Sequence, residues 1–290
     1  MLNHFRTSEF LDRFKVEALG DARFSAVCHP AWPGRAFGGQ LAAQSLMAAA
    51  ATVQDSAKEP ASLHTYFTAP VQSGVPIVYA VESLKEGKTL ATRLVRIYQN
   101  DVLRATANIL FSSAADGPSH EYQSPVVTAP QSLPSEERLI HPTVAPIDAD
   151  FEAMGYPMDS MIDLRIERNK DQAEGVEAYA QKVWMRVTTE LPVDALISAS
   201  VLAYLSDITL GTTLLEAHGG RAKTTDLQLG AIELVLWFFK PASPSKWTLF
   251  SQDALFAGRG RGAANGEFRN QEGDLCAVAF QNALMRYKSL

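Results

Sequence analysis

The sequence predicts an α+β fold that is built twice from one unit, a long buried helix followed by a consecutive antiparallel sheet. Three observations lead to this prediction. The two halves of the chain can be superimposed in an ungapped register. Each half begins with a helix that is apolar on nearly all faces, and each continues with alternating strands that are separated by turn signals.

The internal repeat relates residues 62–113 to residues 233–284 at a constant offset of 171. In this register SLHTYFTAP falls on ELVLWFFKP, and similar side chains pair, as Tyr66 does with Trp237. The identical pairs are Leu63 with Leu234, Phe67 with Phe238, Pro70 with Pro241, Leu84 with Leu255 and Gly87 with Gly258. Because the strand and turn patterns also coincide, the register indicates internal duplication.

Each repeat opens with a segment that is rich in Ala, Leu and Ser on all sides, residues 38–53 in the first half and 197–219 in the second. A helix that is apolar nearly all round is a buried helix. Gly38 and Gly39 stand at the start of the first helix, where they also allow another backbone to come close.

Strands are expected to follow each helix. Residues 103–111 alternate, with small and apolar side chains on one face, and residues 76–84 and 92–100 are the preceding strands. Turn signals stand at 86–88, 99–101 and 271–274. One long helix with an antiparallel sheet curled round it is the hotdog arrangement, so two copies in one chain predict an α+β double hotdog.

The boundary between the repeats is marked by proline. Seven of the 15 prolines fall between residues 118 and 157, in a stretch without helical or strand periodicity. We therefore expect an N-terminal hotdog at 1–113, a Pro-rich connector at 114–159 and a C-terminal hotdog at 160–290.

Composition narrows the functional classes. The net charge of −6 and the lack of a basic stripe argue against a nucleic-acid partner. No stretch approaches 18 consecutive apolar residues, so no membrane span is expected, and the start of the chain lacks signal-peptide features, which favours a cytoplasmic location. Scattered histidines and two isolated cysteines predict neither a metal site nor a disulfide framework. The common nucleophile-elbow, phosphate-loop and dinucleotide motifs are missing, so no cofactor is expected.

Several motifs resemble the acyl-CoA thioesterases of the type II, double-hotdog family. They are FGGQLAAQSL (37–46), LHTYFTAP (63–70), YLSD (204–207), LWFFKP (236–241), RGRGAANGEF (259–268) and AFQNALMR (279–286). The resemblance implies hydrolysis of a fatty acyl-CoA thioester to the free acid and coenzyme A. It also implies a water that is held and polarised by an Asp in the second helix, matched by Asp207, and a Gln in the last strand, matched by Gln281.

The family's third site residue, a Thr or Ser, falls on Ala231, which has no hydroxyl to orient a water. The acidic residue that follows is kept as Glu233, whereas Leu234 and Val235 replace the usual His and Ser. Three outcomes stay open. A nearby hydroxyl (Thr224, Thr225 or Ser206) replaces the missing one, water fills the gap, or activity is reduced or lost.

The chemistry suits these residue types. A thioester carbonyl is electrophilic and its thiolate leaves readily, so a positioned water, a base and oxyanion donors are sufficient. Asp207 is the candidate base because its helix neighbours are apolar, which predicts burial and a perturbed or partnered carboxylate. Gln281 would hold the water through its amide. Backbone N–H groups at Gly38 and Gly39 could receive the oxyanion.

Further residues are candidates for contact with the substrate. His64 either lines the site or is a packed, hydrogen-bonded histidine, and Glu233 and Trp237 belong to the strand that leads through the LWFFKP motif. Arg259 and Arg261 either form a Gly-rich bend between strands or bind the phosphates of coenzyme A.

The sequence thus predicts an acyl-CoA thioesterase that acts as a homo-oligomer, the latter by family analogy. Two alternatives remain. The first is a catalytically impaired acyl-CoA-binding protein, for which Ala231 is the discriminating residue. The second is a hydratase or dehydratase, which would need a His beside the second helix, where none is found.

Overall fold

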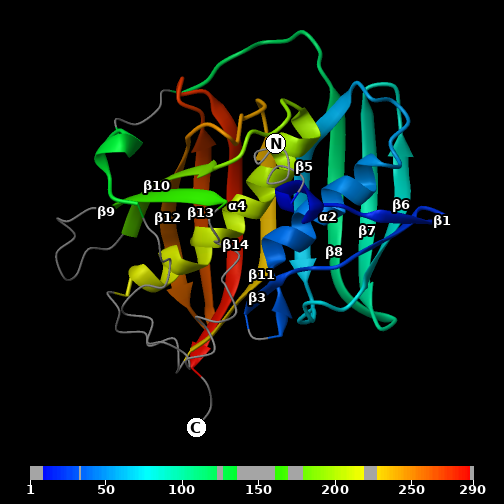
Figure 1. The fold of residues 1–290 in the computed structure, drawn as a ribbon, viewed down its shortest axis with the longest axis horizontal. Coiled ribbons are helices and arrows are strands. Elements are labelled where there is room, and N and C mark those ends of the chain that lie inside the picture. The colour runs from blue at the N-terminus through cyan, green and yellow to red at the C-terminus, as the bar shows by residue number, and fades with distance from the viewer. Residues whose placement is uncertain are drawn as a thin grey trace.

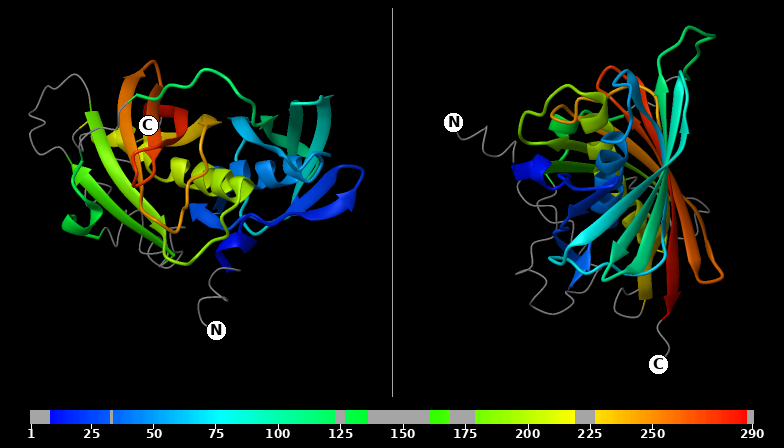
Figure 2. Two further views of the ribbon diagram at one scale, coloured as in Figure 1. Left: turned by 90° about the horizontal axis from the view of Figure 1, so that it is seen from above. Right: turned by 90° about the vertical axis from the view of Figure 1, so that its right-hand side faces the viewer.

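The computed structural model describes residues 9–32, 34–122, 127–135, 161–168, 179–218 and 227–287. Thr224, Thr225 and most of the predicted 114–159 connector lie outside these residues. One large antiparallel sheet forms a single curved layer, and two helices lie on its concave face (Figures 1 and 2). The helices are α2 (Gly38–Ala50) and α4 (Ala195–Glu216). This arrangement confirms the predicted α+β double hotdog.

The sheet has 12 strands in the order β1-β2-β6-β7-β8-β5-β11-β14-β13-β12-β10-β9. The strands of the first half are β1 (Glu17–Gly20), β2 (Arg23–Ala26), β5 (Lys58–Phe67), β6 (Ile77–Glu86), β7 (Leu90–Gln99) and β8 (Val102–Ser113). Those of the second half are β9 (Ile162–Arg168), β10 (Tyr179–Val187), β11 (Leu227–Phe238), β12 (Thr248–Gly258), β13 (Arg261–Arg269) and β14 (Leu275–Tyr287). A small second sheet pairs β3 (Pro30–Trp32) with β4 (Arg35–Ala36), and a 3-10 turn, η1, spans Pro130–Ser132.

The two repeats meet at the centre of the sheet, where β5 pairs with β11. His64 lies opposite Val235 in this pairing, and Thr65 lies opposite Leu234. Each repeat therefore adds its strands outward from one shared seam, so the two halves are related by an approximate two-fold axis through it. Figure 1 shows the blue and cyan repeat on one side of this seam and the yellow to red repeat on the other.

The repeat register differs from the sequence expectation in its last strand. The offset of 171 holds for the helix-facing residues from β5 to β7, but in β8 and β14 it becomes 172, because the turn before β14 is one residue longer. Ile109 pairs with Leu63, and Gln281 pairs with Leu234. The structural counterpart of Gln281 in the first repeat is therefore Ile109, whereas the ungapped register assigned Leu110.

Both helices form where the sequence predicted them, with shifted ends. α2 ends at Ala50, three residues before the predicted end, and α4 begins at Ala195, where Asp194 caps it by accepting the N–H of Ile197 at 2.9 Å. By length and composition α4 could cross a membrane, but 67% of its apolar stretch is buried inside the fold. The long apolar helix is accordingly the core of the second repeat.

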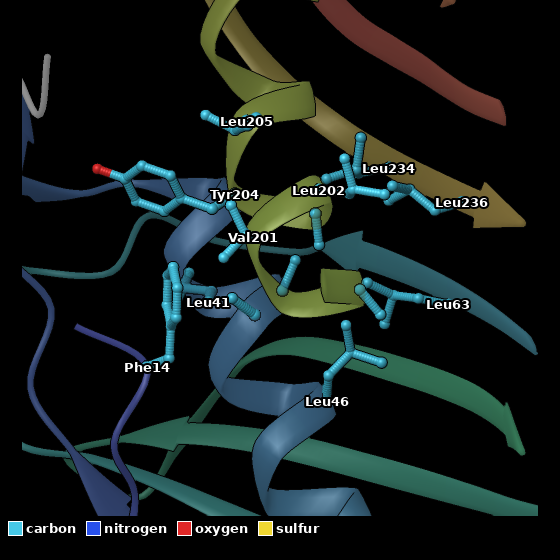
Figure 3. Close-up of a cluster of buried hydrophobic side chains, with 14 of the residues drawn as sticks. Phe14, Leu41, Leu46, Leu63, Val201, Leu202, Tyr204, Leu205, Leu234 and Leu236 are labelled. Carbon is cyan, nitrogen blue, oxygen red and sulfur yellow. The ribbon is translucent and has the colours of Figure 1, made fainter. Parts of the chain in front are cut away.

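The core fills the space between the helices and the seam (Figure 3). The side chains that the figure labels are all at most 3% exposed, and they come from both helices, from the central strands and from the N-terminal segment. They are Phe14, Leu41, Leu46, Leu63, Val201, Leu202, Tyr204, Leu205, Leu234 and Leu236. Small residues such as Ala42 and Ala203, both fully buried, allow α2 and α4 to pack closely. This packing places the N-terminus of α2 against the middle of α4.

Candidate active site

The carboxylate of Asp207 lies where α2, α4 and β14 meet. Its Oδ2 accepts the backbone N–H of Gly39 at 2.8 Å, and its Oδ1 accepts the side-chain amide of Gln281 at 2.5 Å. Gln281 is 3% exposed and shares the helix-facing side of β14 with Ala277 and Ala279, as its alternation predicts. The structure therefore brings Asp207, Gln281 and Gly39 together from three separate elements.

The two glycines are required by this close approach. A Cβ at Gly38 would stand 2.8 Å from Oδ2 of Asp207 and 3.2 Å from the ring of Phe67. A Cβ at Gly39 would stand 2.7 Å from the backbone oxygen of Tyr204, closer than real Cβ atoms come. Gly38 and Gly39 thus allow the backbone of α4 to contact the start of α2, and they let a main-chain amide reach the carboxylate.

Burial raises the pKa of Asp207 from 3.8 to about 7, since a charged carboxylate loses its hydration between the helices. The hydrogen bonds from Gly39 and Gln281 act in the opposite direction, because they favour the charged form. The first turn of α2 has no acidic residue. No carboxylate of the helix itself therefore neutralises the positive end of its dipole, which faces Asp207. A carboxyl group with a pKa near neutrality can accept a proton from water and return it.

Ala231 faces the helices close to this pair. It pairs with Ala283, which is 1% exposed and lies two residues beyond Gln281 on the same face of β14. Of the hydroxyls considered from the sequence, Ser206 donates to the backbone oxygen of Ala203 at 2.9 Å, one turn earlier in α4. Thr224 and Thr225 lie outside the described residues.

A bulge in β11 between Ala231 and Glu233 changes the face that the following residues present. Glu233 and Trp237 consequently lie on the outer face of the sheet, opposite the buried Leu234 and Leu236. His64 is on the same outer face, where its Nε2 is 2.7 Å from Oε1 of Glu233. The structure does not bring His64, Glu233 and Trp237 together with Asp207 and Gln281.

This outer cluster has its own interactions. The ring of Tyr66 lies 4.6 Å from that of His64, and the negative charge of Glu233 raises the pKa of Tyr66. Trp237 meets Phe280 edge to face at 5.8 Å, and both side chains are more than a third exposed. The central strands therefore expose an aromatic surface on the side away from the helices.

Arg259 and Arg261 belong to the tight hairpin between β12 and β13. Gly258 pairs with Arg261 across it, and the two turn residues, Arg259 and Gly260, have φ values of 54° and 74°. A two-residue turn with both φ angles positive matches the twist of the flanking strands. The segment forms the Gly-rich bend that was one of its two interpretations from the sequence, and binding of coenzyme A phosphates by Arg259 or Arg261 stays a prediction. Both arginines are exposed, and Arg261 pairs with Leu284.

One helix-facing polar residue near the site was not identified from the sequence. Thr65 is fully buried on β5, and its hydroxyl has no hydrogen-bond partner. The signal was present in the alternation of LHTYF, which places Thr65 on the same face as Leu63.

The described part of the chain contains further polar groups besides those around Asp207. Within those residues no cluster of three or more His, Cys, Asp or Glu could hold a metal ion. Cys28 and Cys276 are free, buried thiols, and burial raises the pKa of both. A buried amide–hydroxyl network joins Gln181, Thr213 and Gln252, whose polar groups bond to one another.

Two family models match this chain, one to each repeat. A model described as the acyl-CoA thioesterase N-terminal domain matches residues 28–112, and one described as acyl-CoA thioesterase matches residues 157–284. The chain belongs to the acyl-CoA thioesterase family. The first match covers α2 and the strands β5 to β8, and the second covers α4 and β9 to β14 up to Leu284, so all three residues of the Asp207 site lie within matched segments.

Members of the acyl-CoA thioesterase family that resemble the chain over most of its length include bacterial and human proteins. Acyl-CoA thioesterase 2 of Haemophilus influenzae is 29% identical over 280 residues, which cover 94% of this chain and 95% of that protein. Human acyl-coenzyme A thioesterase 8 is 27% identical over 267 residues, which cover 88% and 81% of the two chains.

Solved structures agree with this family assignment. The acyl-CoA thioesterase II TesB2 from Mycobacterium marinum superimposes with a TM-score of 0.80 at 28% identity, covering 96% of this chain and 98% of that one. A hot dog fold protein of unknown function from Alicyclobacillus acidocaldarius has a TM-score of 0.76 at 22% identity, covering 97% and 99%. The latter likeness concerns the fold alone.

Proposed function

We propose that this protein hydrolyses an acyl-CoA thioester to a free acid and coenzyme A, with a water molecule held by Asp207 and Gln281. The observation that supports this proposal most strongly is the half-buried carboxylate of Asp207, which is bonded to Gln281 and Gly39 and has a pKa raised to about 7. The family membership of the chain and the names of its relatives support the choice of substrate.

In the proposed reaction the oxygen of the water attacks the thioester carbonyl carbon while Asp207 accepts one proton. The carbonyl electron pair moves to the oxygen, and the oxyanion forms beside the start of α2. The first N–H groups of a helix have no acceptor within the helix. Since that of Gly39 is bonded to Asp207, the N–H of Gly38 is the candidate oxyanion donor.

Collapse of the oxyanion breaks the carbon–sulfur bond. The thiolate of coenzyme A leaves and takes the proton that Asp207 had accepted, so one water is consumed and one acid and one thiol are formed. The amide of Gln281 fixes the carboxylate through Oδ1, and its carbonyl oxygen is left to accept a hydrogen bond from the attacking water. No covalent intermediate on the protein is required.

The alternative function, an acyl-CoA-binding protein that does not turn over its ligand, depends on Ala231, whereas the family membership of the chain supports hydrolysis. The position faces the helices and offers only a methyl group next to the site. The hydratase alternative lacks an equivalent observation, since His64 lies on the opposite face of the sheet from Asp207 and bonds to Glu233.

The test is release of free coenzyme A, followed with a thiol reagent over acyl-CoAs from short to long chain. We expect release by the wild type and a loss of at least about a hundredfold in Asp207→Asn. Asp101→Asn is the matched control, because Asp101 stands in the exposed β7–β8 turn with a positive φ that Asn adopts equally well. Binding by calorimetry without release would support the binding-protein alternative and reject hydrolysis.

Three further expectations belong to this proposal. The division into repeats at 1–113 and 160–290 is one, and limited proteolysis would test whether cleavage falls in 114–159.

Self-association through the outer aromatic surface of Tyr66, Trp237 and Phe280 is another, supported by the exposure of these rings. A cytoplasmic location is the third, and fractionation of native cells would test it.

A further inference from the structure

Thr65 is a buried hydroxyl that the fold leaves unsatisfied. Its side chain is fully buried and its Oγ1 has no hydrogen-bond partner. Leaving a buried hydroxyl without a partner costs stability, and valine, which has the same shape, would avoid that cost. An unsatisfied polar group of this kind calls for an explanation, such as a ligand or water that it binds during function.

The position of Thr65 places it in the same row as the candidate site. Thr65 pairs with Leu234, and Leu234 pairs with Gln281, so the three side chains face the helices from adjacent strands about 5 Å apart. Two residues further along the same face of β5, the ring of Phe67 lies against Gly38, and Asp207 lies against Gly38 as well. Thr65 is therefore on the sheet beneath the junction of α2 and α4.

The approximate two-fold symmetry of the repeats makes Thr65 more conspicuous. In sequence, LAAQSL (41–46) in α2 aligns with LAYLSD (202–207) in α4, with identical residues at three of the six positions. In this alignment Asp207 corresponds to Leu46, and the strand register relates Gln281 to Ile109 and Thr65 to Leu236.

The symmetry-related counterpart of the site is thus apolar at all three positions, and its members Leu46, Ile109 and Leu236 are at most 1% exposed. At the three corresponding positions of the candidate site the residues are polar: Asp207 and Gln281 from the second repeat and Thr65 from the first. Two of them are bonded to each other, and the third is the unsatisfied hydroxyl. Of the two symmetry-related positions on the central strand pair, the polar one, Thr65, shares a row with Gln281, whereas the apolar one, Leu236, shares a row with Ile109.

We propose that Thr65 supplies, from the first repeat, the hydroxyl that position 231 lacks in the second, and that it positions the water that attacks the thioester. This inference rests on the hydrolysis proposed above. The hydroxyl accepts or donates one hydrogen bond to the water, while Asp207 accepts the water's proton. Ala231 is then compatible with activity, because Thr65 provides the missing hydroxyl oxygen from β5, the strand next to β11.

Thr65→Val tests this role with almost no change in shape. We expect kcat for release of coenzyme A to fall about ten- to a hundredfold, with KM within about threefold of the wild type. The melting temperature should stay the same or rise, because an unpaired buried hydroxyl has been removed. Thr65→Ser should recover most of kcat, since it keeps the oxygen.

Two companion variants sharpen the test. Ala231→Thr, placed in the Thr65→Val chain, should restore kcat at least about tenfold, because the hydroxyl returns at the other position. Ser200→Ala is the matched control. Ser200 also has a buried, unpartnered hydroxyl, but it lies on α4 at the position related to Gly39, beside the apolar counterpart of the site. Its kcat should stay within about twofold of the wild type.

The outcomes separate the two proposals. A wild type that releases coenzyme A through Asp207, with Thr65→Val unchanged in kcat, would overturn the role of Thr65 alone. A Thr65→Ser variant as inactive as Thr65→Val would also overturn that role, since this pattern indicates packing. A wild type that releases no coenzyme A from any acyl-CoA would instead overturn the hydrolysis proposal.

Discussion

The backbone N–H of Gly39 donates to the carboxylate of Asp207 across 2.8 Å, from the helix of one repeat to the helix of the other. The candidate site is therefore assembled from both halves of the chain, although Asp207 and Gln281 both belong to the second. Neither repeat alone could form it. Among the described residues, the related position in the first repeat is apolar, because it holds Leu46 and Ile109.

A methyl group at Gly39 should disrupt this contact. In Gly39→Ala the new Cβ would lie 2.7 Å from the backbone oxygen of Tyr204 and 3.0 Å from the Cβ of Asp207, so α2 and α4 must move apart. We expect a loss of about 1–3 kcal/mol in the free energy of unfolding and a larger than tenfold loss of kcat. Denaturant unfolding and coenzyme A release measure the two effects.

Gly117→Ala provides the comparison, because a Cβ there meets no atom within 4 Å. If Gly39→Ala matched Gly117→Ala in stability and activity, close packing at the start of α2 would not be required.

Gln281→Met should shift the titration of Asp207 upward. The amide of Gln281 donates to Oδ1 and thereby lowers the pKa of the carboxyl, opposing the effect of burial. Without the donor the pKa should rise above about 7, so the pH at which activity is half-maximal moves to more alkaline values and the rate at pH 7 falls. An unchanged pH profile in this variant would show that the hydrogen bond does not tune Asp207.

Burial of Asp207 should also make stability depend on pH. The pKa is raised from 3.8 to about 7 on folding, so the folded state holds the proton more tightly than the unfolded state. Stability from this group is present below pH 3.8 and is lost as the pH rises through about 7. The asparagine side chain of the Asp207→Asn variant does not titrate. The free energy of unfolding of the variant minus that of the wild type should therefore increase by about 2–4 kcal/mol between about pH 4 and pH 8.

Urea unfolding at a series of pH values measures this difference, with Asp101→Asn as the control for a general charge effect. A difference between wild type and Asp207→Asn that does not change with pH would mean that the carboxyl titrates in the folded protein as it does when unfolded.

Substitutions in the outer cluster of His64, Glu233 and Tyr66 should leave the rate of hydrolysis nearly unchanged. His64 bonds to Glu233 on the face of the sheet that is turned away from Asp207. His64→Ala should therefore keep kcat within about threefold of the wild type, whereas Asp207→Asn loses it. Steady-state kinetics on the two variants check this, and a loss in His64→Ala comparable to that in Asp207→Asn would place the histidine in the site after all.

Much of the fold could be predicted because its signals are local. Strand alternation, Gly-containing turns and the apolar sides of both helices are read within about ten residues, and the repeat confirmed each of them a second time. Asp207 was indicated by the resemblance to a family, and the apolar residues around it in the helix supported its burial. Gln281 was found because the resemblance to a family pointed to the last strand.

The rest depends on contacts between distant segments. The bulge at Ala231 and Glu233 reverses the face of β11, and a single inserted residue of this kind is invisible in the alternation. The pairing of β5 with β11 places Thr65 opposite Leu234, and only this register brings Thr65 into one row with Gln281. The turn before β14 is one residue longer than its counterpart before β8. For this reason the counterpart of Gln281 is Ile109 and not Leu110, which the ungapped register of the sequence assigned.

The central claim, that Asp207 is the base in thioester hydrolysis, is tested most directly by the pH dependence of kcat/KM for release of coenzyme A. Because the base acts as carboxylate and its pKa is raised to about 7, kcat/KM should fall below neutrality with an inflection near pH 7. The residual activity of Asp207→Asn should lack that inflection. A wild-type profile that is flat from about pH 5.5 to 8.5, or an inflection that persists in Asp207→Asn, would contradict the account.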